Sequence, residues 1–483
     1  FWLMRLMTSD DRLAAAATLF ILCLGTFGIV YGPVRLLFGL DTTYNFSHLP
    51  FLRRYQPAAP FALLFVFCAL VWRALTAEQD RDAWLSSLFG GLTFAALVFS
   101  YFYLWTAAAA WLACVTLGWL LLRPDKFRRG IKALSLTLLL SLASLPPYFY
   151  LVAQRAPTMD TMQLLALTHA PDFSRSSERL SLLLMLVFVY ALRRGRVMMK
   201  SPLAIFALSF ALAPLLIFNQ QIITGRSLQP LHYEMYVTKY LTLVALALTV
   251  VLLRRVREQS RLSTRALAVV AFVSFGWGIT ETVIATERTL QATLGRDEAR
   301  HVAARLADIS RHAPNSQPAL DTLVLYTNIA YADAAPALCP QPVLWSPHTP
   351  AFSGVTWQEN KERIYRLLYF TGFDETGVDE YELEKLDYQK LFLLRSLVGW
   401  GHANAAWTVN WQPIKPEELR EELRNYAGYR ASFDRERAAQ LPLSYVVTSD
   451  EEGVDFRNLD RWHERDAGER IGKFMLYRVR LKP

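Results

Sequence analysis

The sequence predicts a polytopic α-helical membrane protein of about nine transmembrane helices, followed by a C-terminal extracytoplasmic α/β domain. Three observations support this fold class. Apolar runs recur through the first 285 residues, and most reach the ~17–20 residues that cross a ~30 Å hydrocarbon core. Lys and Arg gather in short connections between those runs. Beyond residue 285 the chain turns acidic, and short strand-like segments alternate with helical ones.

Charge divides the chain into two parts. Residues 1–285 carry 26 Lys and Arg against 13 Asp and Glu, whereas residues 286–483 carry 25 against 29. The positive charge lies in clusters between apolar runs, which is typical of a membrane protein rather than of a nucleic-acid-binding surface. We therefore predict a transmembrane domain over 1–285, a soluble domain over 286–483, and no nucleic-acid partner.

The predicted spans are apolar runs with almost no charge inside them. Lipid offers the backbone no hydrogen-bond partners, so each segment that crosses it is expected to be helical. Of the 13 acidic residues in this half, only Glu281 touches a run, near its end. The runs lie at 13–32, 60–76, 85–104, 106–122, 133–152, 180–192, 202–218, 239–253 and 266–284.

The basic clusters predict the orientation in the membrane. Alternate connections hold 18 of the 26 Lys and Arg, most clearly in RPDKFRRGIK, RRGRVMMK and RRVREQSRLSTR. Positive connections face the cytoplasm. The N-terminus is therefore expected in the cytoplasm, and the connections at 33–59, 153–179 and 219–238 are expected outside with the C-terminal domain. This orientation predicts a multi-pass membrane protein whose C-terminal domain is extracytoplasmic.

The stretch FNQQIITGRSLQPLHYE (218–234) lies between two apolar runs and is unusually polar. Asn219 and Gln221 offer the donors and acceptors that sugar hydroxyls require. Arg226 is suited to clamping a phosphate. His232 is a further candidate for the sugar site, and Glu234 for proton transfer. The alternative is that these groups cap helix ends and meet lipid headgroups.

Two further outer segments carry candidate residues. FSYFYLWT (99–106) is predicted to form a tight outer turn, where Tyr101 and Trp105 either stack on a sugar or guide a lipid chain. Simple anchoring in the aromatic belt of the interface is the alternative. Asp41 is the preferred catalytic carboxylate, as a base or as a ligand of a divalent cation beside a pyrophosphate. A solvated loop Asp is the other reading, and Arg35 nearby meets either phosphate or headgroups.

The soluble part is predicted to be a small α/β domain. TLVLYTN, PVLWS, LSYVVTS and FMLYRVRL are rich in β-branched and aromatic residues, which is typical of strands. WQENKERIYRLLYFTG, residues 381–398 and PEELREELRNYAG show helical patterning. TERTLQATLGRDEARHVAARLADISRH is expected to continue the last transmembrane helix into this domain. Its histidines show no metal-ligand spacing, and no protein-bound metal site is predicted.

The helix number, the polar outer loops, YFYLWT, NQQIITGRSLQPLHYE and the C-terminal α/β domain together resemble bacterial membrane glycosyltransferases of the GT-C type. The resemblance implies an enzyme that takes a sugar from a polyprenyl-phosphate donor on the outer leaflet and inverts the anomeric centre. It also implies a catalytic Asp or Glu in the first outer loop, where Asp41 lies. The chain begins at Phe1 without a signal-peptide pattern, so a preceding block of helices that carries the base is an open alternative.

The resemblance implies a bacterial inner-membrane protein with a periplasmic C-terminal domain. It also implies membrane lipids, a polyprenyl-phosphate sugar and an envelope glycan, lipid or protein acceptor as partners. In this interpretation Arg226 meets the lipid phosphate, and Asn219, Gln221 and His232 surround the sugar. A divalent cation is the one cofactor left open. Two other classes remain: a transporter of lipid-linked saccharide, and a non-enzymatic protein whose outer domain binds a partner. A transporter is expected to place ionisable groups within its spans.

Overall fold

The computed structural model consists of two compact units. The first contains Phe1–Ala153 and Ala166–Thr289, and the second contains Gln154–Leu165 and Leu290–Pro483. The structure describes residues 1–40, 48–53, 55–155, 159, 166–227, 229–255, 263–312, 322–351, 354–379, 383–399, 414–450 and 452–483. The division after Thr289 lies close to the boundary at residue 285 that the change in charge predicts.

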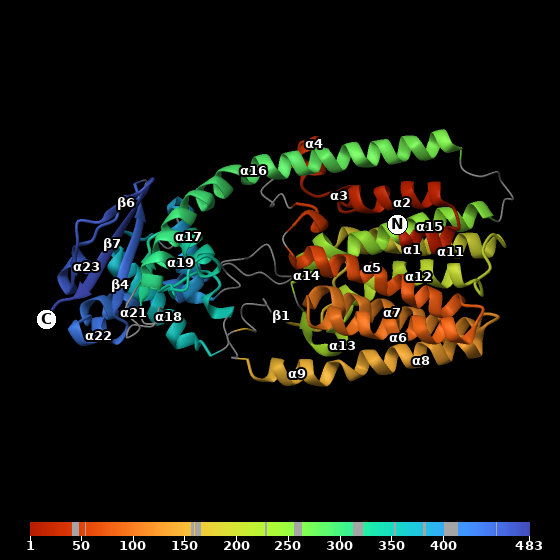
Figure 1. The fold of residues 1–483 in the computed structure, drawn as a ribbon, viewed down its shortest axis with the longest axis horizontal. Coiled ribbons are helices and arrows are strands. Elements are labelled where there is room, and N and C mark those ends of the chain that lie inside the picture. The colour runs from red at the N-terminus through yellow and green to blue at the C-terminus, as the bar shows by residue number, and fades with distance from the viewer. Residues whose placement is uncertain are drawn as a thin grey trace. The chain divides into compact units, whose positions relative to one another are not determined.

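The first unit is a bundle of helices (Figure 1). Its elements are α1 (Trp2–Thr8), α2 (Asp11–Cys23), α3 (Gly25–Ile29), α4 (Pro33–Leu37), η1 (Pro50–Leu52), α5 (Tyr55–Thr76), α6 (Asp80–Val98), α7 (Phe102–Leu122), α8 (Phe127–Ala143), α9 (Leu145–Ala153), β1 (Ala166–Leu167), α11 (Ser176–Arg193), α12 (Pro202–Asn219), α13 (Gln221–Thr224), β2 (Arg226–Ser227), α14 (Pro230–Tyr233), the π-helix η2 (Glu234–Thr238), α15 (Lys239–Arg255) and the first part of α16 (Thr264–His312). Each long helix coincides with one of the apolar runs, as expected for backbone that must satisfy its own hydrogen bonds.

Aromatic side chains fill the interior of this bundle. α5 packs against α6, α6 against α8, and α12 against both α7 and α15. Trp111 and Trp119 of α7 are fully buried, and the Trp111 ring packs edge-on to Phe206 with 5.4 Å between centroids. Gly130 of α8 allows the backbone to approach Trp119, because a Cβ there would lie 2.2 Å from the indole nitrogen.

Six helical segments in the described part of the chain are long and apolar enough to cross a membrane: Pro57–Thr76, Phe102–Leu122, Phe127–Ala153, Pro202–Thr224, Pro230–Arg254 and Thr264–His312. The protein is therefore a membrane-embedded helical protein. The other three predicted spans correspond to α2 with α3, α6, and α11. The first of these is interrupted at Leu24, and charged residues lie in the first turns of α6 and α11.

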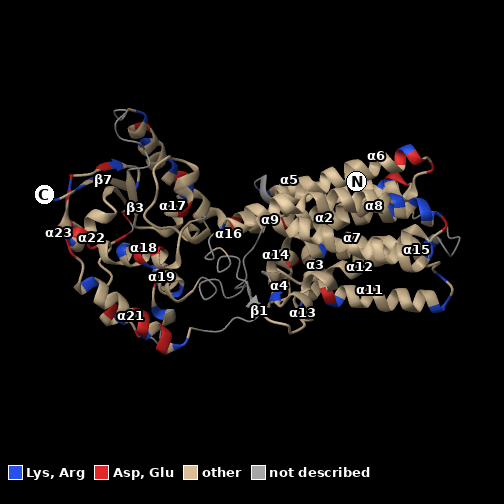
Figure 2. Cartoon of the chain, turned by 90° about the horizontal axis from the view of Figure 1, so that it is seen from below, with Lys and Arg blue, Asp and Glu red and all other residues tan. Residues whose placement is uncertain are grey.

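Charge in the first unit concentrates at one end of the bundle (Figure 2), where α6 and α8 begin and α11 and α15 end. We call this the basic end. It contains the connections in which the sequence places Arg123, Lys126 and Arg193. The stretch 218–234 follows α12 and precedes α15, so it lies at the opposite end of the bundle.

The second unit is built on a small mixed sheet. β3 (Leu323–Tyr326) pairs in parallel with β4 (Leu443–Ser449), with Tyr326 opposite Val447. β4 pairs antiparallel with β7 (Phe474–Leu481), and β7 also pairs with β5 (His463–Arg465) and β6 (Glu469–Ile471). The sheet order is β3-β4-β7-β5, with β6 beside β7.

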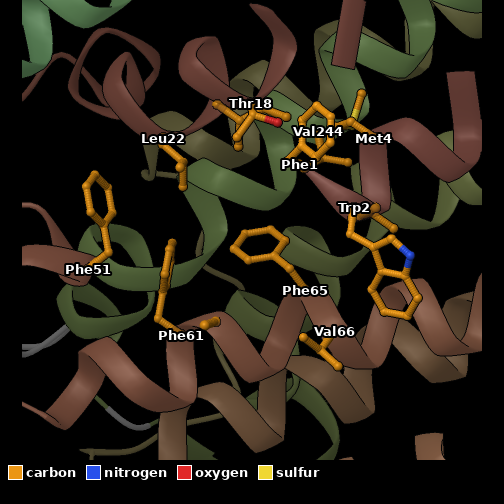
Figure 3. A pocket seen from close by; sticks show the side chains of 13 residues that line it. Phe1, Trp2, Met4, Thr18, Leu22, Phe51, Phe61, Phe65, Val66 and Val244 are labelled. Atoms are coloured by element: carbon orange, nitrogen blue, oxygen red, sulfur yellow. The ribbon is translucent and has the colours of Figure 1, made fainter. Parts of the chain in front are cut away.

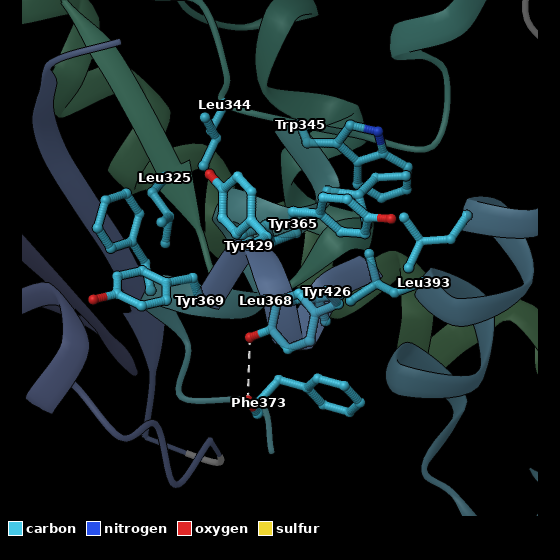
Figure 4. Close-up of a cluster of buried hydrophobic side chains, with 14 of the residues drawn as sticks. Leu325, Leu344, Trp345, Tyr365, Leu368, Tyr369, Phe373, Leu393, Tyr426 and Tyr429 are labelled. Atoms are coloured by element: carbon cyan, nitrogen blue, oxygen red, sulfur yellow. Dashed lines mark hydrogen bonds between the residues drawn. The ribbon is translucent and has the colours of Figure 1, made fainter. Parts of the chain in front are cut away.

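Helices cover both faces of this sheet. Val302 and Leu306, in the last part of α16, pack with Val324 and Tyr326 on one face. On the other face, α18 (Trp357–Phe370) and α21 (Pro416–Ala431) bury an aromatic cluster, in which the Tyr426 hydroxyl donates to the Phe373 carbonyl at 3.1 Å (Figure 4). The remaining elements are α17 (Ile329–Ala334), η4 (Ala335–Ala337), η5 (Thr349–Ala351), η6 (Glu375–Gly377), η7 (Leu383–Lys385), α19 (Tyr388–Val398), α22 (Arg435–Gln440) and α23 (Arg457–Trp462).

Two sequence predictions need correction, and two short strands were missed. PVLWS is not a strand, because only Val343 forms a bridge, to Val324. The strands β5 and β6 were not predicted, since three residues are too few to show a period. The outer turn predicted over 99–106 lies at residues 99–101 instead, because α6 ends at Val98 and α7 already begins at Phe102.

Candidate functional site

The polar stretch 218–234 folds back between α12 and α15 instead of continuing either helix. α12 ends at Asn219, and the single turn α13 ends at Gly225, whose φ of 69° lies in the left-handed region that glycine favours. β2 then pairs antiparallel with β1, so that Leu167 lies opposite Arg226. α14 and the π-helix η2 lead into α15. π-helical turns within α-helices are frequent at functional sites.

Asn219 joins the end of α12 to the segment before α11. Its amide nitrogen donates to Glu178 Oε1 at 2.7 Å and to the Asp172 carbonyl at 3.2 Å. Its amide oxygen accepts from the Asp172 backbone N–H at 3.0 Å. Gln221, which is 1% exposed, donates to the Ala170 carbonyl at 3.1 Å. Both amides predicted to bind sugar are therefore engaged in holding the 170–178 segment.

Glu234 caps the N-terminus of α11. Its Oε1 accepts from the backbone N–H of Ser176 at 2.8 Å and of Ser177 at 3.4 Å, and Arg175 lies 4.0 Å from Oε2. A carboxylate at a helix N-terminus satisfies unpaired N–H groups and interacts favourably with the helix dipole. The structure thus gives Glu234 a positioning role, while its role in proton transfer stays a prediction.

Asp172 is the charged anchor of this network. Burial of the Asp172 carboxylate raises its pKa, but hydrogen bonds from the Ser174 hydroxyl and N–H and the nearby Arg175 guanidinium outweigh that effect, and the net shift is downward. Arg175 Nε lies 3.1 Å from Asp172 Oδ2. Asp172 therefore stays ionised near neutral pH and holds Arg175 between two carboxylates, its own and that of Glu234.

A group of neighbouring rings, which we call the aromatic wall, consists of Tyr101, Tyr103, His232 and Tyr236. Tyr103 stacks on His232 with 4.7 Å between ring centroids and an interplanar angle of 9°, and its hydroxyl donates to Gln229 Oε1 at 2.6 Å. Tyr101 packs 5.4 Å from Tyr103, and Tyr236 lies 5.6 Å from His232. Burial raises the pKa of Tyr101, so its hydroxyl stays neutral. Tyr101 and His232 thus both contact Tyr103, and their role in binding a sugar stays a prediction.

Arg53 contacts Tyr236 of the aromatic wall. Its guanidinium lies 4.9 Å from the centre of the Tyr236 ring and donates to the Tyr236 hydroxyl. Arg53 is exposed and directly follows η1, whose Phe51 lines an apolar cavity. A cation at the junction of an aromatic wall and an apolar cavity is suited to an amphiphilic anion. Arg53 is not among the predicted site residues, because it precedes Tyr236 by 183 positions and no local pattern records this contact.

The apolar cavity has a volume of about 330 Å³ (Figure 3). Aromatic and aliphatic side chains from α1, α2, η1, α5 and α15 line it, among them Phe51, Phe61, Phe65 and Val244. Phe61 also packs edge-on to Tyr240, one turn beyond Tyr236, with 4.9 Å between centroids. Phe61 thus joins the lining of the cavity to α15, the helix that follows Tyr236.

The remaining predicted residues lie in different settings. Arg226 is exposed, and Gln220 donates to its carbonyl at 2.6 Å. Trp105 lies within α7, is 8% exposed and packs against Tyr148 with 5.4 Å between ring centroids. Its contact with a sugar or a lipid chain stays a prediction. Arg35 is half-buried in the last turn of α4, and Asp41 lies outside the described residues.

Two buried ionisable residues lie at the edges of apolar runs, and the sequence predicted no role for either. Lys239 is 6% exposed and Glu281 is 3% exposed, and each interacts electrostatically with the other. A Cβ on Gly25 would lie 3.0 Å from Lys239 Cδ, and the neighbouring Thr26 donates to the Glu281 carboxylate. The pair therefore connects α3, α15 and α16 within the first unit.

No group of three or more His, Cys, Asp or Glu among the described residues is placed to hold a metal ion. No protein-family model matches the chain, and a search of curated proteins finds no match. The functional assignment therefore depends on the geometry of the site.

Proposed function

We propose that the protein is a GT-C-type membrane glycosyltransferase that moves a sugar from a polyprenyl-phosphate donor to an acceptor on the periplasmic side. The observation that carries this proposal is the junction at Arg53. There an apolar cavity, an exposed guanidinium and a polar aromatic wall follow one another within the first unit. This order matches the order of chemistry in the donor, which has a lipid chain, a phosphate and a sugar.

Each part of the donor then has a counterpart. The proximal isoprene units would fill the cavity lined by Phe51, Phe61 and Val244, because burial of apolar surface stabilises by about 25 cal/mol per Å². Arg53 would pair with the phosphate, and Arg226 is the second candidate. The sugar would lie against Tyr101 and His232, since sugars stack on ring faces and donate to neighbouring acceptors.

The transfer step breaks the bond from the anomeric carbon to the phosphate oxygen and forms a bond to an acceptor oxygen. A carboxylate removes the acceptor proton, and the lipid phosphate leaves with the electron pair of the broken bond. Asp41 and Glu234 are the candidates for this base. The capping contacts of Glu234 favour Asp41, or a carboxylate outside this chain, over Glu234.

Binding of short-chain polyprenyl-phosphate sugars to the full-length chain in detergent tests the donor site. Loss of a charge-assisted hydrogen bond costs about 1.5–3 kcal/mol, so we expect Arg53→Ala to weaken binding by about tenfold or more. Arg193→Ala, at the basic end, is the matched control and should leave binding unchanged. Equal binding by Arg53→Ala, Arg226→Ala and wild type would refute this phosphate site.

Transport of a lipid-linked saccharide is the second candidate, and one specific observation favours it. Lys239 and Glu281 form a buried ionisable pair between helices that are apolar enough to span a membrane, as in many transporters. Proteoliposomes containing a fluorescent lipid-linked saccharide distinguish the two functions. A transferase consumes the donor only when an acceptor is present, whereas a transporter moves the intact donor between leaflets without one.

A further inference from the structure

The segment that follows α3 exposes a short apolar surface. Leu36, Leu37, Phe38 and Leu40 are between 42% and 64% exposed. Gly39 completes the run, so no polar side chain interrupts it. We call residues 36–40 the apolar tip. Several consecutive apolar residues rarely face water on a protein surface, and where they do they mark a contact with a partner or a membrane.

Two glycines and a proline shape the backbone around the tip. Gly32, with φ 52°, and Gly39, with φ 65°, lie in the left-handed region that glycine favours. Between them α4 begins at Pro33 and ends at Leu37, so its five residues rise only about 7.5 Å. A helix of this length cannot cross a hydrocarbon core of ~30 Å. The tip is therefore confined to one level of the membrane unit.

The chain reaches the tip from a contact with α16. Phe27 of α3 packs against Trp277 with 4.4 Å between ring centroids. The neighbouring Thr26 donates to the Glu281 carboxylate. Both partners lie in the last two turns of the apolar run 266–284. The residues before the tip are therefore held close to the outer end of this run.

The chain beyond the tip returns to the same part of α16. His48 is the first residue described after position 40, and its Nε2 lies 3.4 Å from Thr286 Oγ1. Thr286 lies two residues, or roughly 3 Å along the helix, beyond the apolar run. Figures 1 and 2 both show α4 at the end of the bundle opposite the basic end. These contacts place the tip at the boundary of the hydrocarbon core.

We propose that the apolar tip binds the membrane leaflet at this end of the bundle, the outer leaflet in the predicted orientation. Leu37 and Phe38 lie among the upper parts of the acyl chains, and Arg35 lies at the level of the headgroups. Lipid is the occupant because it also faces α16 at this level, where Ile279 and Val283 are 50% and 58% exposed. Apolar side chains at this depth beside a basic residue are typical of interfacial anchors.

This anchor goes beyond the proposed function and does not depend on it. The sequence predicts that residues 33–59 form an outer connection between two spans, whereas the contacts with α16 give part of that connection a partner of its own. Binding of the tip to lipid would fix the depth of α3 and α4 in the membrane. A polyprenyl-phosphate donor is not needed for this contact.

Photo-crosslinking from the tip tests this surface. The full-length chain carries p-benzoylphenylalanine in place of Phe38 or Leu37 and is reconstituted as single copies in nanodiscs of phosphatidylcholine and phosphatidylglycerol. Mass spectrometry then measures lipid adducts. Leu139 on α8 is the matched positive control, because it and both tip residues are 64% exposed. Leu338, which is 40% exposed in the second unit, is the negative control.

Adducts at both tip positions should reach within about twofold of those at Leu139 and exceed those at Leu338. Unchanged thermal unfolding midpoints should show that both substituted chains are folded. Leu139 lies near the middle of the span Phe127–Ala153, so its adducts should map to the ends of the acyl chains. Adducts from the tip should map to acyl carbons near the glycerol instead.

Three results would overturn the proposal. In the first, folded chains with the label at Leu37 or Phe38 give no more lipid adduct than the label at Leu338. In the second, adducts from the tip map to the ends of the acyl chains, which would mean deep insertion. In the third, vesicles that hold several copies yield crosslinks from the tip to a second copy in place of lipid. These readouts contain no donor, so they are independent of the donor site at Arg53.

Discussion

Two residues of the first unit that were predicted to take part in chemistry, Glu234 and Asn219, also hold neighbouring segments in place. Glu234 sits in a π-helical turn beside the aromatic wall, where a catalytic group is expected, yet its carboxylate caps α11. Asn219 likewise binds Glu178 and Asp172 instead of facing solvent. These residues shape the candidate donor site by fixing the segment that precedes α11.

Two substitutions of Glu234 separate positioning from catalysis. Gln retains an oxygen that accepts from Ser176, whereas Ala removes it, so we expect Ala to destabilise the protein by about 0.5–2 kcal/mol and Gln by less. Thermal unfolding of the full-length chain in detergent measures this difference. If Glu234 is the catalytic base instead, Glu234→Gln will abolish transfer while leaving the unfolding midpoint near that of wild type.

His463 makes the second unit sensitive to acid. It is 1% exposed and packs edge-on against Phe370, and burial lowers its pKa to about 4. The unfolded chain takes up this proton below its ordinary pKa of about 6.5, whereas the folded chain does so only near pH 4. The stability contributed by neutral His463 is therefore complete above pH 6.5 and falls by about 2 kcal/mol between pH 6.5 and 5.

Hydrogen exchange in β4, compared between wild type and His463→Leu at each pH, measures this effect. The ratio of exchange rates at one pH cancels the intrinsic chemistry. Wild type should lose protection relative to the variant between pH 6.5 and 5. A ratio that does not change with pH would show that His463 does not control this loss of stability.

At the scale of helices, close approach and buried charge decide how the first unit packs. Gly130 lets α8 lie against Trp119 of α7. Lys239 and Glu281 connect α15 with α16 near α3. The apolar runs predicted most of these helices, because lipid restricts a spanning segment to one backbone conformation. The runs did not predict the packing partners, since contacts between helices depend on side chains far apart in sequence.

Gly130→Ala should disrupt the contact between α7 and α8. The new Cβ would lie 2.2 Å from the indole nitrogen of Trp119, a fully buried side chain, so we expect a loss of about 1–3 kcal/mol. Gly276→Ala in α16 is the matched control, because nothing lies within 4 Å of its Cβ. Thermal unfolding midpoints in detergent should fall for the first variant only, and equal midpoints would contradict this packing.

The Lys239–Glu281 pair should show strong coupling. Removing one partner leaves the other buried without it, so Lys239→Met and Glu281→Leu should each lower the thermal unfolding midpoint. The double variant should cost less than the sum of the single variants, because it leaves neither charge behind. A thermal unfolding cycle measures this coupling. Additive losses would mean that the two groups do not stabilise each other.

At the scale of the whole molecule, the sequence separates a helical membrane unit from a unit with a small sheet. Charge and hydropathy predicted this separation, the long helix α16 and the strands β3, β4 and β7, because each depends on local composition. The junction between Arg53, Tyr236 and the apolar cavity was not predictable in the same way. It joins η1 to η2 across 183 sequence positions, and no local pattern records such a contact.

The orientation of the membrane unit is a further prediction at this scale. A membrane-impermeant thiol reagent applied to intact cells should label a cysteine introduced at Thr224 but not one introduced at Arg196. The basic end carries Arg196 and should face the cytoplasm, whereas Thr224 ends α13 in the outer stretch. Labelling of the cysteine at position 196 but not of the one at position 224 would show that the membrane unit has the opposite orientation.

Photo-crosslinking with a short polyprenyl phosphate that carries a diazirine in its first isoprene units tests the donor site most directly. The site predicts that the label attaches to residues 51–66 and near Val244, and that Ala62→Trp, which fills the cavity, removes this labelling while Leu139→Trp on the exposed surface of α8 does not. Labelling confined to the exposed faces of α8 and α9, unchanged by Ala62→Trp, would contradict a lipid-linked donor in this cavity.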